Sequence, residues 1–312
     1  MRARDAPARP HGTPAGGATR GGGASRLEGL RVLVTGASSG IGEITSTMLA
    51  LRGCRVAGAG RSFARSAVPF VLETFVEGDL TEPGAPEEVV RSAAAALGGL
   101  DVVVSNAGAG WSGAFGSMAQ SELDWVFDLN LRAPLHLARA AAGHLVRSGG
   151  QLVLVGSVAG KVGVAEEVAY SAAKAGLSGF ADGLRSEWSP LGVAVTLVSP
   201  GVVDTPFFSR RNRPYMRTWP KPVPAAVVGH AVVRAISSRT AEVYVPYWTA
   251  LVARFHGAAP GLYRLLAERG SGLGAVAAPD RERRHERPGE TCERPHEHPG
   301  EPSNGSAGCN GG

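Results

Sequence analysis

The chain has 312 residues, of which 44% are hydrophobic and 19% are charged, enough for one large folded domain. No run of 18 apolar residues and no signal-peptide pattern occurs, which excludes a spanning helix and predicts a soluble cytoplasmic protein. The three widely spaced cysteines suggest neither a disulfide framework nor a zinc site, so we expect no bound metal. Much of the net charge of +5 comes from an arginine-bearing N-terminal segment, so we expect no nucleic-acid partner.

Composition divides the chain into three segments. Residues 1–27 consist largely of Arg, Ala, Gly and Pro, and we expect a disordered leader there because so few apolar side chains cannot offset the entropy of ordering. Residues 278–312 repeat charged and Pro-Gly elements, which predicts a disordered, charged tail. Residues 28–277 are therefore predicted to form the single folded domain.

Short apolar runs alternate with segments of helical period in this domain. The predicted strands are Leu30–Thr35, Arg55–Ala59, Phe70–Glu77, Leu100–Ser105, Gln151–Val155, Val193–Val198 and Glu242–Val245. The predicted helices are Ile41–Arg52, Pro86–Leu97, Glu122–Arg147, Val168–Trp188 and Ala225–Ser237. The helices alternate with strands that are apolar throughout. This pattern predicts an α/β fold, a single Rossmann-type doubly wound domain with a mainly parallel seven-stranded sheet and helices on both faces. A ligand is expected at the carboxyl ends of its strands.

The first predicted strand leads directly into a glycine-rich turn, Thr35-Gly36-Ala37-Ser38-Ser39-Gly40-Ile41-Gly42. Gly36 allows a sharp turn, Gly40 allows the backbone to approach a phosphate, and Gly42 allows the next helix to pack closely on the sheet. The N-terminus of that helix offers free N–H groups and a positive dipole to a diphosphate. A glycine turn alone is weak evidence, but here it follows the first strand of a βαβ pattern, which is the context that dinucleotide binding requires.

Further motifs follow in a fixed order, and together they resemble the short-chain dehydrogenase/reductase family over roughly residues 29–270. They are Ser105-Asn106-Ala107-Gly108, Asn130, Ser157, Tyr170-Ser171-Ala172-Ala173-Lys174, Pro200-Gly201 and Thr205. Ser105 replaces the first Asn of the family's motif at that turn. A Tyr–Lys pair on a helix or a Ser after a strand is usually structural when it occurs alone, whereas the shared order and spacing favour function. The resemblance implies an NAD(P)-dependent enzyme acting on CH–OH groups, and it implies a homodimer or homotetramer with the two long helices as candidate interface elements.

Residue chemistry suggests how such an enzyme would work. Reduction of a carbonyl by hydride yields an alkoxide that needs a proton, and Tyr170 is the predicted general acid for reduction and general base for oxidation. Lys174 lies one helical turn away, so its ammonium is expected to lower the pKa of the phenol. Ser157 is expected to donate a hydrogen bond to the substrate oxygen. By resemblance, Asn130 holds a water through which Lys174 reaches solvent, and Lys174 binds the nicotinamide ribose.

The residue after the second strand indicates which nicotinamide cofactor is bound. Gly58-Ala59-Gly60-Arg61-Ser62 contains no acid to accept a bond from a ribose 2′-hydroxyl, and Arg61 occupies the family's NADP position. We expect NADP(H), with NAD(H) possible; the alternative for Arg61 is a solvated loop residue. Asp79 resembles an adenine-contacting residue, although a loop Asp that caps the next helix is the alternative. The predicted cofactor-binding residues are Gly36, Ser38, Ser39, Gly40, Ile41, Arg61, Ser62, Asp79, Leu80, Asn106, Ala107, Gly108, Tyr170, Lys174, Pro200, Gly201, Val203 and Thr205.

Two aromatic-rich segments bear on the substrate. The segment Phe207–Trp219, called the flap below, interleaves Phe, Tyr, Met and Trp with four arginines and is expected to cover a lipophilic substrate, with a distal anion as a further option. The apolar stripe from Tyr247 to Leu266 is typical of core or of an oligomer interface. Because basic residues accompany that stripe, weak peripheral membrane contact is the alternative.

The favoured function is NADP(H)-dependent interconversion of a ketone or aldehyde and an alcohol on a lipophilic molecule such as a steroid, acyl chain, polyketide or retinoid-like compound. An NAD-preferring secondary-alcohol dehydrogenase is a second interpretation. A non-catalytic cofactor-sensing protein is a third, but it has no need of Asn130, Ser157, Tyr170 and Lys174 together.

Overall fold

A computed structural model describes residues 26–62, 71–211, 213, 215 and 219–269. The strands are β1 (Arg31–Thr35), β2 (Arg55–Gly60), β3 (Thr74–Glu77), β4 (Val102–Ser105), β5 (Gln151–Val155), β6 (Ala194–Pro200), β7 (Val203–Asp204), β8 (Val223–Pro224) and β9 (Glu242–Val245). The α-helices are α1 (Gly40–Ala50), α2 (Ala85–Leu97), α3 (Gln120–Phe127), α4 (Ala133–Ser148), α5 (Ala159–Val162), α6 (Val168–Trp188), α7 (Phe207–Arg210), α8 (Ala225–Ser238), α9 (Thr249–Ala258) and α10 (Pro260–Arg269). Short 3₁₀ turns are η2 (Phe115–Ser117) and η4 (Ser189–Leu191), and η3 (Asp128–Arg132) is a π turn.

Seven strands form one sheet in the order β3-β2-β1-β4-β5-β6-β9, and every neighbouring pair is parallel. The predicted fold class is therefore confirmed. The strands are rich in Val and Leu and buried on both faces, as parallel sheets require. Strand order reverses between β1 and β4, which is where doubly wound sheets bind ligands at the carboxyl ends of their strands.

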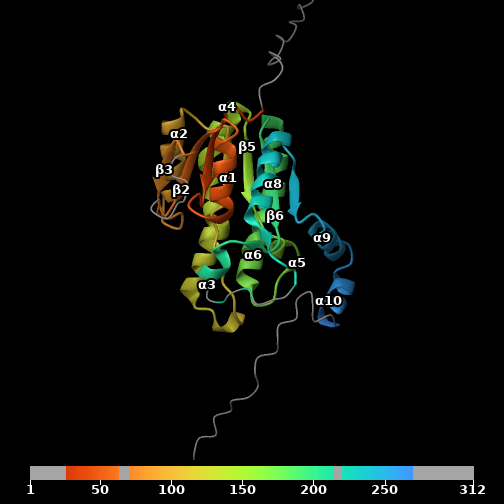
Figure 1. Ribbon diagram of the computed structural model, residues 1–312. Helices are drawn as coiled ribbons and strands as arrows, with labels where there is room; N and C mark the ends of the chain where they lie inside the picture. Colours follow the sequence, from red (N-terminus) through yellow and green to blue (C-terminus); the bar gives the residue numbers. More distant parts are fainter. Residues whose placement is uncertain (1–25, 63–70, 212, 214, 216–218, 270–312) are drawn as a thin grey trace, which may run out of the picture. The chain divides into compact units, whose positions relative to one another are not determined.

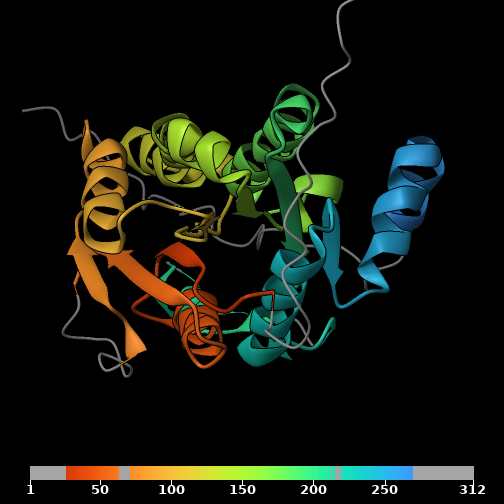
Figure 2. The same cartoon turned by 90° about the horizontal axis from the view of Figure 1, so that it is seen from above.

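Helices cover both faces of the sheet (Figures 1 and 2). On one face α1 packs against α8, and on the other α2 packs against α4. Each face has its own apolar core: Leu33, Leu137 and Leu152 belong to one, whereas Val34 and Val228 belong to the other. Alternate residues of β1 thus point to opposite cores, which follows from the period of two along a strand.

The predicted helix Glu122–Arg147 is interrupted, and this part of the prediction is wrong. The chain forms α3, then the π turn η3, then α4. Pro134 has no N–H to donate within a regular helix and lies in the first turn of α4. In the π turn the N–H of Ala133 bonds instead to Asp128, five residues earlier. The turn contains Asn130, which is fully buried.

The N-terminal boundary of the domain also differs from the prediction. Leu27, assigned by composition to the disordered leader, is only 3% exposed and belongs to a core cluster. Its carbonyl accepts a hydrogen bond from the thiol of Cys54, at 3.1 Å. The domain therefore begins before residue 28. Residues 1–25 and the predicted tail 278–312 lie outside the described residues, as does Phe70 at the predicted start of the third strand.

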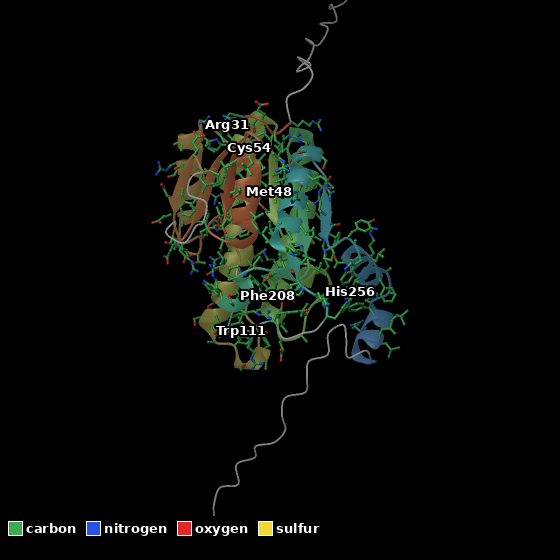
Figure 3. All side chains as sticks on the ribbon, viewed as in Figure 1. Arg31, Met48, Cys54, Trp111, Phe208 and His256 are labelled. Carbon is green, nitrogen blue, oxygen red and sulfur yellow. The ribbon has the colours of Figure 1, made fainter. Side chains whose placement is uncertain are left out.

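The two ends of the sheet differ in character. At the amino end of β1, the Arg31 guanidinium forms an ion pair of 2.7 Å with Asp101, which raises the pKa of Arg31 through hydrogen bonding. Figure 3 shows Arg31 at this end, with Phe208 and Trp111 near the opposite end. That opposite end, where the strands finish, contains the cavity described next.

Candidate active site

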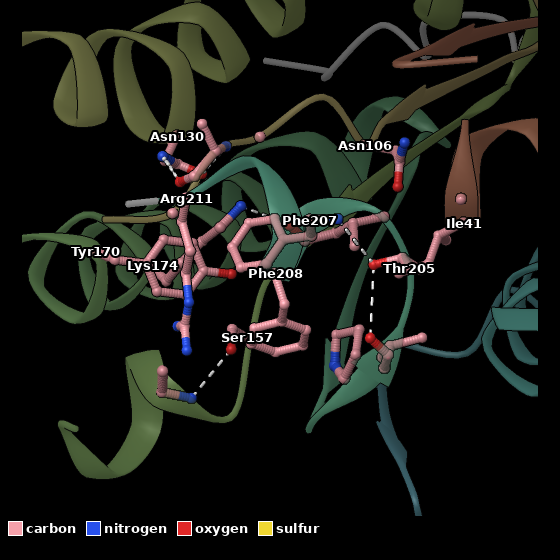
Figure 4. A pocket seen from close by; sticks show the side chains of 18 of the residues that line it. Ile41, Asn106, Asn130, Ser157, Tyr170, Lys174, Thr205, Phe207, Phe208 and Arg211 are labelled. Atoms are coloured by element: carbon pink, nitrogen blue, oxygen red, sulfur yellow. Dashed lines mark hydrogen bonds between the residues drawn. The ribbon is translucent and has the colours of Figure 1, made fainter. Parts of the chain in front are cut away.

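A cavity of about 660 Å³ lies at the carboxyl ends of the parallel strands (Figure 4). All of the residues that the sequence predicts for the site line it. They are Gly36, Ser38, Ser39, Gly40, Ile41, Arg61, Ser62, Asp79, Leu80, Asn106, Ala107, Gly108, Asn130, Ser157, Tyr170, Lys174, Pro200, Gly201, Val203 and Thr205. The fold thus brings together residues from eight separate segments of the chain around one space.

The glycine-rich turn is held by close backbone packing. Gly36 has a φ of +67°, a left-handed conformation that favours glycine. A β-carbon at Gly42 would lie 2.2 Å from the carbonyl oxygen of Gly36 and 2.5 Å from Nδ2 of Asn106. Asn106 Nδ2 donates to the Thr35 carbonyl at 2.9 Å, which ties the end of β4 to the turn. The roles that the sequence suggests for Gly36 and Gly42 thus agree with the packing seen here.

The turn also fits a dinucleotide diphosphate. Ser39 precedes α1 in an extended conformation, and its side chain makes no capping bond to the helix. The first N–H groups of α1 therefore have no capping side chain, and Gly40 and Ile41 line the cavity, where an anion would bind these groups. Gly60 adjoins this turn, since a β-carbon there would lie 3.4 Å from Oγ of Ser38. The exposed Arg61 follows at the edge of the cavity, where a 2′-phosphate would fit.

Asp79 lines the cavity, but its carboxylate already has local partners. Oδ1 accepts hydrogen bonds from the Thr81 N–H at 3.0 Å and from its hydroxyl at 2.8 Å. This is a turn formed by Asp79 itself, and α2 begins later with Gly84 as its N-cap residue. The helix-capping alternative is therefore wrong, and the contact of Asp79 with adenine stays a prediction.

Asn130 fixes the loop after β4. Its Nδ2 donates to the carbonyls of Ala109 and Val126, at 2.8 and 2.9 Å, and its Oδ1 accepts from the Ala109 N–H at 3.3 Å. The π turn directs this side chain toward the loop. Gly108 separates it from Lys174, because a β-carbon there would lie 2.9 Å from Oδ1 of Asn130 and 3.6 Å from Nζ of Lys174.

Ser157, Tyr170 and Lys174 point into the same part of the cavity (Figure 4). Ser157 follows β5, and its Oγ accepts a hydrogen bond from the Ala159 N–H at 3.1 Å. Tyr170 and Lys174 lie one turn apart on α6, and both are almost fully buried. The Lys174 ammonium donates to the carbonyl of Val155 at 2.9 Å and lies 5.8 Å from the centre of the Tyr170 ring.

Burial determines the proton affinities of this pair. Desolvation raises the pKa of Tyr170; a hydrogen bond with Ser157 opposes the rise, Glu167 adds to it and Arg211 opposes it. Desolvation lowers the pKa of Lys174 to about 8. The sequence predicts a lowered pKa for Tyr170, and the structure shows the opposite direction because loss of water outweighs the neighbouring charges. The phenol is therefore held in its protonated form.

Comparison with known proteins identifies the family. The family model for short chain dehydrogenases matches residues 31–215. The chain belongs to the short-chain dehydrogenase family. It is therefore an NAD(P)-dependent oxidoreductase by family, as the sequence predicts.

Similar proteins cover most of the described domain. The chain is 33% identical over 227 residues to the 3-oxoacyl-(acyl-carrier-protein) reductase FabG of Vibrio cholerae, covering 70% of this chain and 91% of that protein. It is 36% identical over 236 residues to an uncharacterized oxidoreductase of Myxococcus xanthus, covering 71% and 89%. A solved short chain dehydrogenase from Burkholderia cenocepacia, in complex with NADP, is 30% identical with a TM-score of 0.63 and covers 70% and 97%.

The structure adds three residues that sequence reasoning did not assign to the site, Glu167, Arg210 and Arg211. The guanidinium of Arg211 forms an ion pair of 2.7 Å with Glu167 and lies 4.6 Å from the ring centre of Phe208. Arg210, its neighbour, donates through Nη1 to Oγ of Ser39 at 3.0 Å. All three residues line the cavity. The clustered arginines of the flap were the only sequence signal, and periodicity does not say in which direction each one points.

Two other kinds of feature are absent from the described residues. Among the described helices, none combines the length and apolar character needed to cross a bilayer. Within the same residues, no group of three or more His, Cys, Asp or Glu side chains is arranged to hold a metal ion.

Proposed function

We propose that this dehydrogenase uses NADPH to reduce a carbonyl group on a lipophilic molecule. The observation that carries the proposal is the convergence of Ser157, Tyr170 and Lys174 at one cavity that also reaches Arg61. The bound cofactor supplies the hydride.

Tyr170 is proposed to donate the proton. Reduction needs a protonated phenol beside the carbonyl oxygen, and the raised pKa of Tyr170 maintains that form. The hydroxyl of Ser157 donates to the same oxygen and stabilises the charge that develops there. Lys174, fixed to the end of β5, is proposed to bind the nicotinamide ribose, and its pKa of about 8 suits proton exchange near neutral pH. The water-holding role implied for Asn130 stays a prediction.

Arg61 is proposed to select NADP(H) over NAD(H). It lies with Ser62 at the edge of the cavity beyond β2, and the similar Burkholderia protein was solved with NADP. A guanidinium there would pair with the 2′-phosphate that only NADPH carries. We expect kcat/KM to be higher for NADPH than for NADH in the wild-type enzyme. A clear preference for NADH would support the second interpretation, an NAD-preferring secondary-alcohol dehydrogenase.

The cavity walls support a lipophilic substrate. Aromatic side chains of the flap and Trp248, which directly precedes α9, line the cavity: the Phe207 ring lies 5.6 Å from the Tyr170 ring, and Trp219 stacks on Trp248 at 5.2 Å. Arg211 and Arg213 of the flap pair with Glu167 and Glu166. These pairs engage both guanidiniums, and Arg210 of the flap reaches Ser39 in the glycine-rich turn, so an apolar ketone or an acyl chain is favoured over an anionic one.

The direct test is NADPH oxidation by the full chain with ketones and aldehydes of graded size. Turnover of apolar carbonyls should fall by at least 100-fold in Tyr170→Phe, within the range of general acid–base contributions, while the variant still binds NADPH in calorimetry. Retained turnover would refute the role of Tyr170. Tight NADPH binding with no turnover in the wild type would instead support the non-catalytic sensor.

Assembly, membrane contact and location remain further predictions. We propose a homodimer or homotetramer, with α4 and α6 as interface elements, to be measured by light scattering. Exposed apolar side chains of α9 and α10 include Leu251, Leu262 and Leu266, and Arg254 and Arg264 accompany them. This face makes weak membrane contact the alternative, which absence of sedimentation with anionic liposomes would exclude. A cytoplasmic location is expected and is to be tested by fractionation.

A further inference from the structure

Arg210 and Arg211 are consecutive residues of the flap, but their side chains go to opposite walls of the cavity. Arg211 reaches Glu167 at the start of α6 and is 5% exposed. Arg210, at the end of α7, reaches Ser39 in the glycine-rich turn. No acidic side chain among the described residues forms an ion pair with Arg210. Its positive charge is thus placed at the turn without an anionic partner.

We propose that Arg210 binds the diphosphate of the nicotinamide cofactor, so that the flap as well as the glycine-rich turn holds the cofactor. This inference rests on the proposed function. Its ligand class is a dinucleotide diphosphate, which presents the oxygens that a guanidinium bonds with two parallel N–H groups.

The position of Ser39 supports a phosphate at this point. Ser39 directly precedes α1, whose first N–H groups lack a side-chain cap, and these groups and the helix dipole favour an anion. The guanidinium of Arg210 bonds to the hydroxyl of that same residue. A diphosphate bound to the helix N-terminus would therefore lie between the backbone N–H groups on one side and the Arg210 guanidinium on the other.

The segment that directly precedes the flap also lies close to the turn. A β-carbon at Gly40 would lie 3.2 Å from Cβ of Thr205, so the two segments touch directly before α7 begins. The N–H of Arg210 donates to the carbonyl of Pro206 at 3.1 Å, which sets the direction in which its side chain leaves the helix. Arg210 therefore extends toward the turn from the short helix α7, whose backbone is hydrogen-bonded at this point.

The geometry assigns Arg210 to the diphosphate and not to the 2′-phosphate. Ser38 adjoins Gly60, so the pocket beyond β2 that contains Arg61 lies on the side of the turn next to that strand. Ser39 and Gly40 lie on the side next to Thr205 and the flap. The two arginines thus flank different parts of the turn. Arg61 would contact a group unique to NADPH, whereas Arg210 would contact a group shared with NADH.

This difference yields a direct binding test on the full chain. Dissociation constants for NADPH and NADH are measured by calorimetry in the wild type, Arg210→Gln and Arg61→Gln. Arg210→Gln should weaken both cofactors by a similar factor of about tenfold, the value of one hydrogen bond to a charged group. Arg61→Gln should weaken NADPH alone. Arg210→Lys should recover part of the loss, since it restores the charge without the paired N–H groups.

Arg213→Gln is the matched control, because Arg213 is another flap arginine, does not line the cavity and pairs with Glu166 at 3.7 Å. It should leave both dissociation constants unchanged. Since the Arg210 side chain is exposed, its loss should not lower the melting temperature, which is measured in parallel.

The inference fails if Arg210→Gln binds both cofactors as tightly as the wild type, or if only NADPH is weakened. Failure of the proposed function is a different result: the wild type would then bind neither dinucleotide, or would bind without reducing any carbonyl.

Discussion

The two walls of the cavity hold their functional groups by different means. On the wall formed by the strand ends, the partners are backbone atoms. Nδ2 of Asn106 donates to the Thr35 carbonyl, and Nζ of Lys174 donates to the Val155 carbonyl. The second wall, called the flap wall, consists of the flap and of Glu167 at the start of α6. Its partners are side chains, as in the ion pair of Glu167 with Arg211 and the edge-to-face rings of Phe207 and Phe208.

This difference explains why one wall is easier to infer from sequence than the other. A backbone partner is present whatever residue occupies the position, so the wall demands only a few residue types at fixed spacing. A side-chain partner depends on two particular residues that are distant in sequence, 44 positions apart for Glu167 and Arg211. Substitutions on the first wall should therefore chiefly disturb the fold, whereas those on the flap wall should also change proton affinity and substrate choice.

The largest effect is expected for Gly42→Ala on the strand-end wall. The added methyl group would lie 2.2 Å from the Gly36 carbonyl oxygen, and neither backbone segment can yield without breaking the Asn106 contact. Overpacking of this kind costs about 3 kcal/mol of unfolding free energy. The melting temperature should fall by several degrees, as measured by calorimetry, and cofactor binding should fall with it.

Gly179→Ala provides the control for that substitution. Gly179 is exposed on α6, and nothing lies within 4 Å of an added β-carbon. Alanine in an open helix position should raise the unfolding free energy by about 0.5–1 kcal/mol. Equal melting temperatures for the two variants would show that the strand-end wall is not packed as tightly as proposed.

The next effect is expected for Glu167→Gln on the flap wall. The amide keeps a hydrogen bond to Arg211 but leaves its guanidinium, 5% exposed, without a counter-ion. The loss of unfolding free energy should be about 2 kcal/mol, at the lower end of values for broken buried pairs. Because Glu167 raises the pKa of Tyr170, its neutralisation should lower that pKa. In the oxidation direction, the rate should therefore rise at a lower pH than in the wild type.

Arg211→Met is the opposite change in charge. Arg211 lowers the pKa of Tyr170, so this variant should move the same pH profile to higher pH. If the pH profiles of kcat/KM moved in the same direction in both variants, the shifts in the pKa of Tyr170 would not be electrostatic in origin.

The residues of the strand-end wall can be predicted from the sequence, whereas the side-chain pairs of the flap cannot. The former are held by backbone atoms, and the latter depend on pairs of residues that are distant in sequence. The glycines, Asn106, Ser157 and the Tyr170–Lys174 pair all line the cavity, because βα junctions of a parallel sheet must meet at one edge. The interruption at Asn130 arises from a π turn, which a helical apolar period does not reveal. The direction of the Tyr170 pKa shift depends on burial, a property of the assembled fold. The arginines of the flap alternate with aromatic residues, and only the fold shows that Arg210 faces the cofactor turn.

A change in the pH dependence of stability is expected for Lys174→Met. The folded-state pKa of Lys174 is about 8, below its ordinary value of 10.5. Between these values the unfolded chain binds more protons than the folded protein, so the wild-type unfolding free energy should gain up to about 1.4 kcal/mol per pH unit as pH rises. The methionine variant lacks this gain.

The comparison is made between pH 8 and 10 by urea denaturation. Cys54, with a pKa raised to about 11 by burial, and Tyr170, whose raised pKa also reflects burial, destabilise the fold at higher pH. Both contributions are present in the wild type and in the variant, so they cancel in the difference. Parallel stability curves for the two proteins would mean that Lys174 is not desolvated in the folded state.

The smallest effect is expected for Phe207→Leu on the flap wall. The Phe207 ring lies 5.6 Å from the ring of Tyr170 and faces Gly110, where a β-carbon would lie 2.6 Å from Cζ. Leucine keeps the apolar contact but removes the flat ring beside the proton donor. The room gained should raise kcat/KM for branched ketones over linear ones by about tenfold, the order of discrimination that one or two methylene groups provide. Activity with the smallest aldehyde should not change, because such a substrate does not reach the flap. An equal change for all substrates would show that Phe207 does not select among substrates. It would contradict the proposed difference between the two walls.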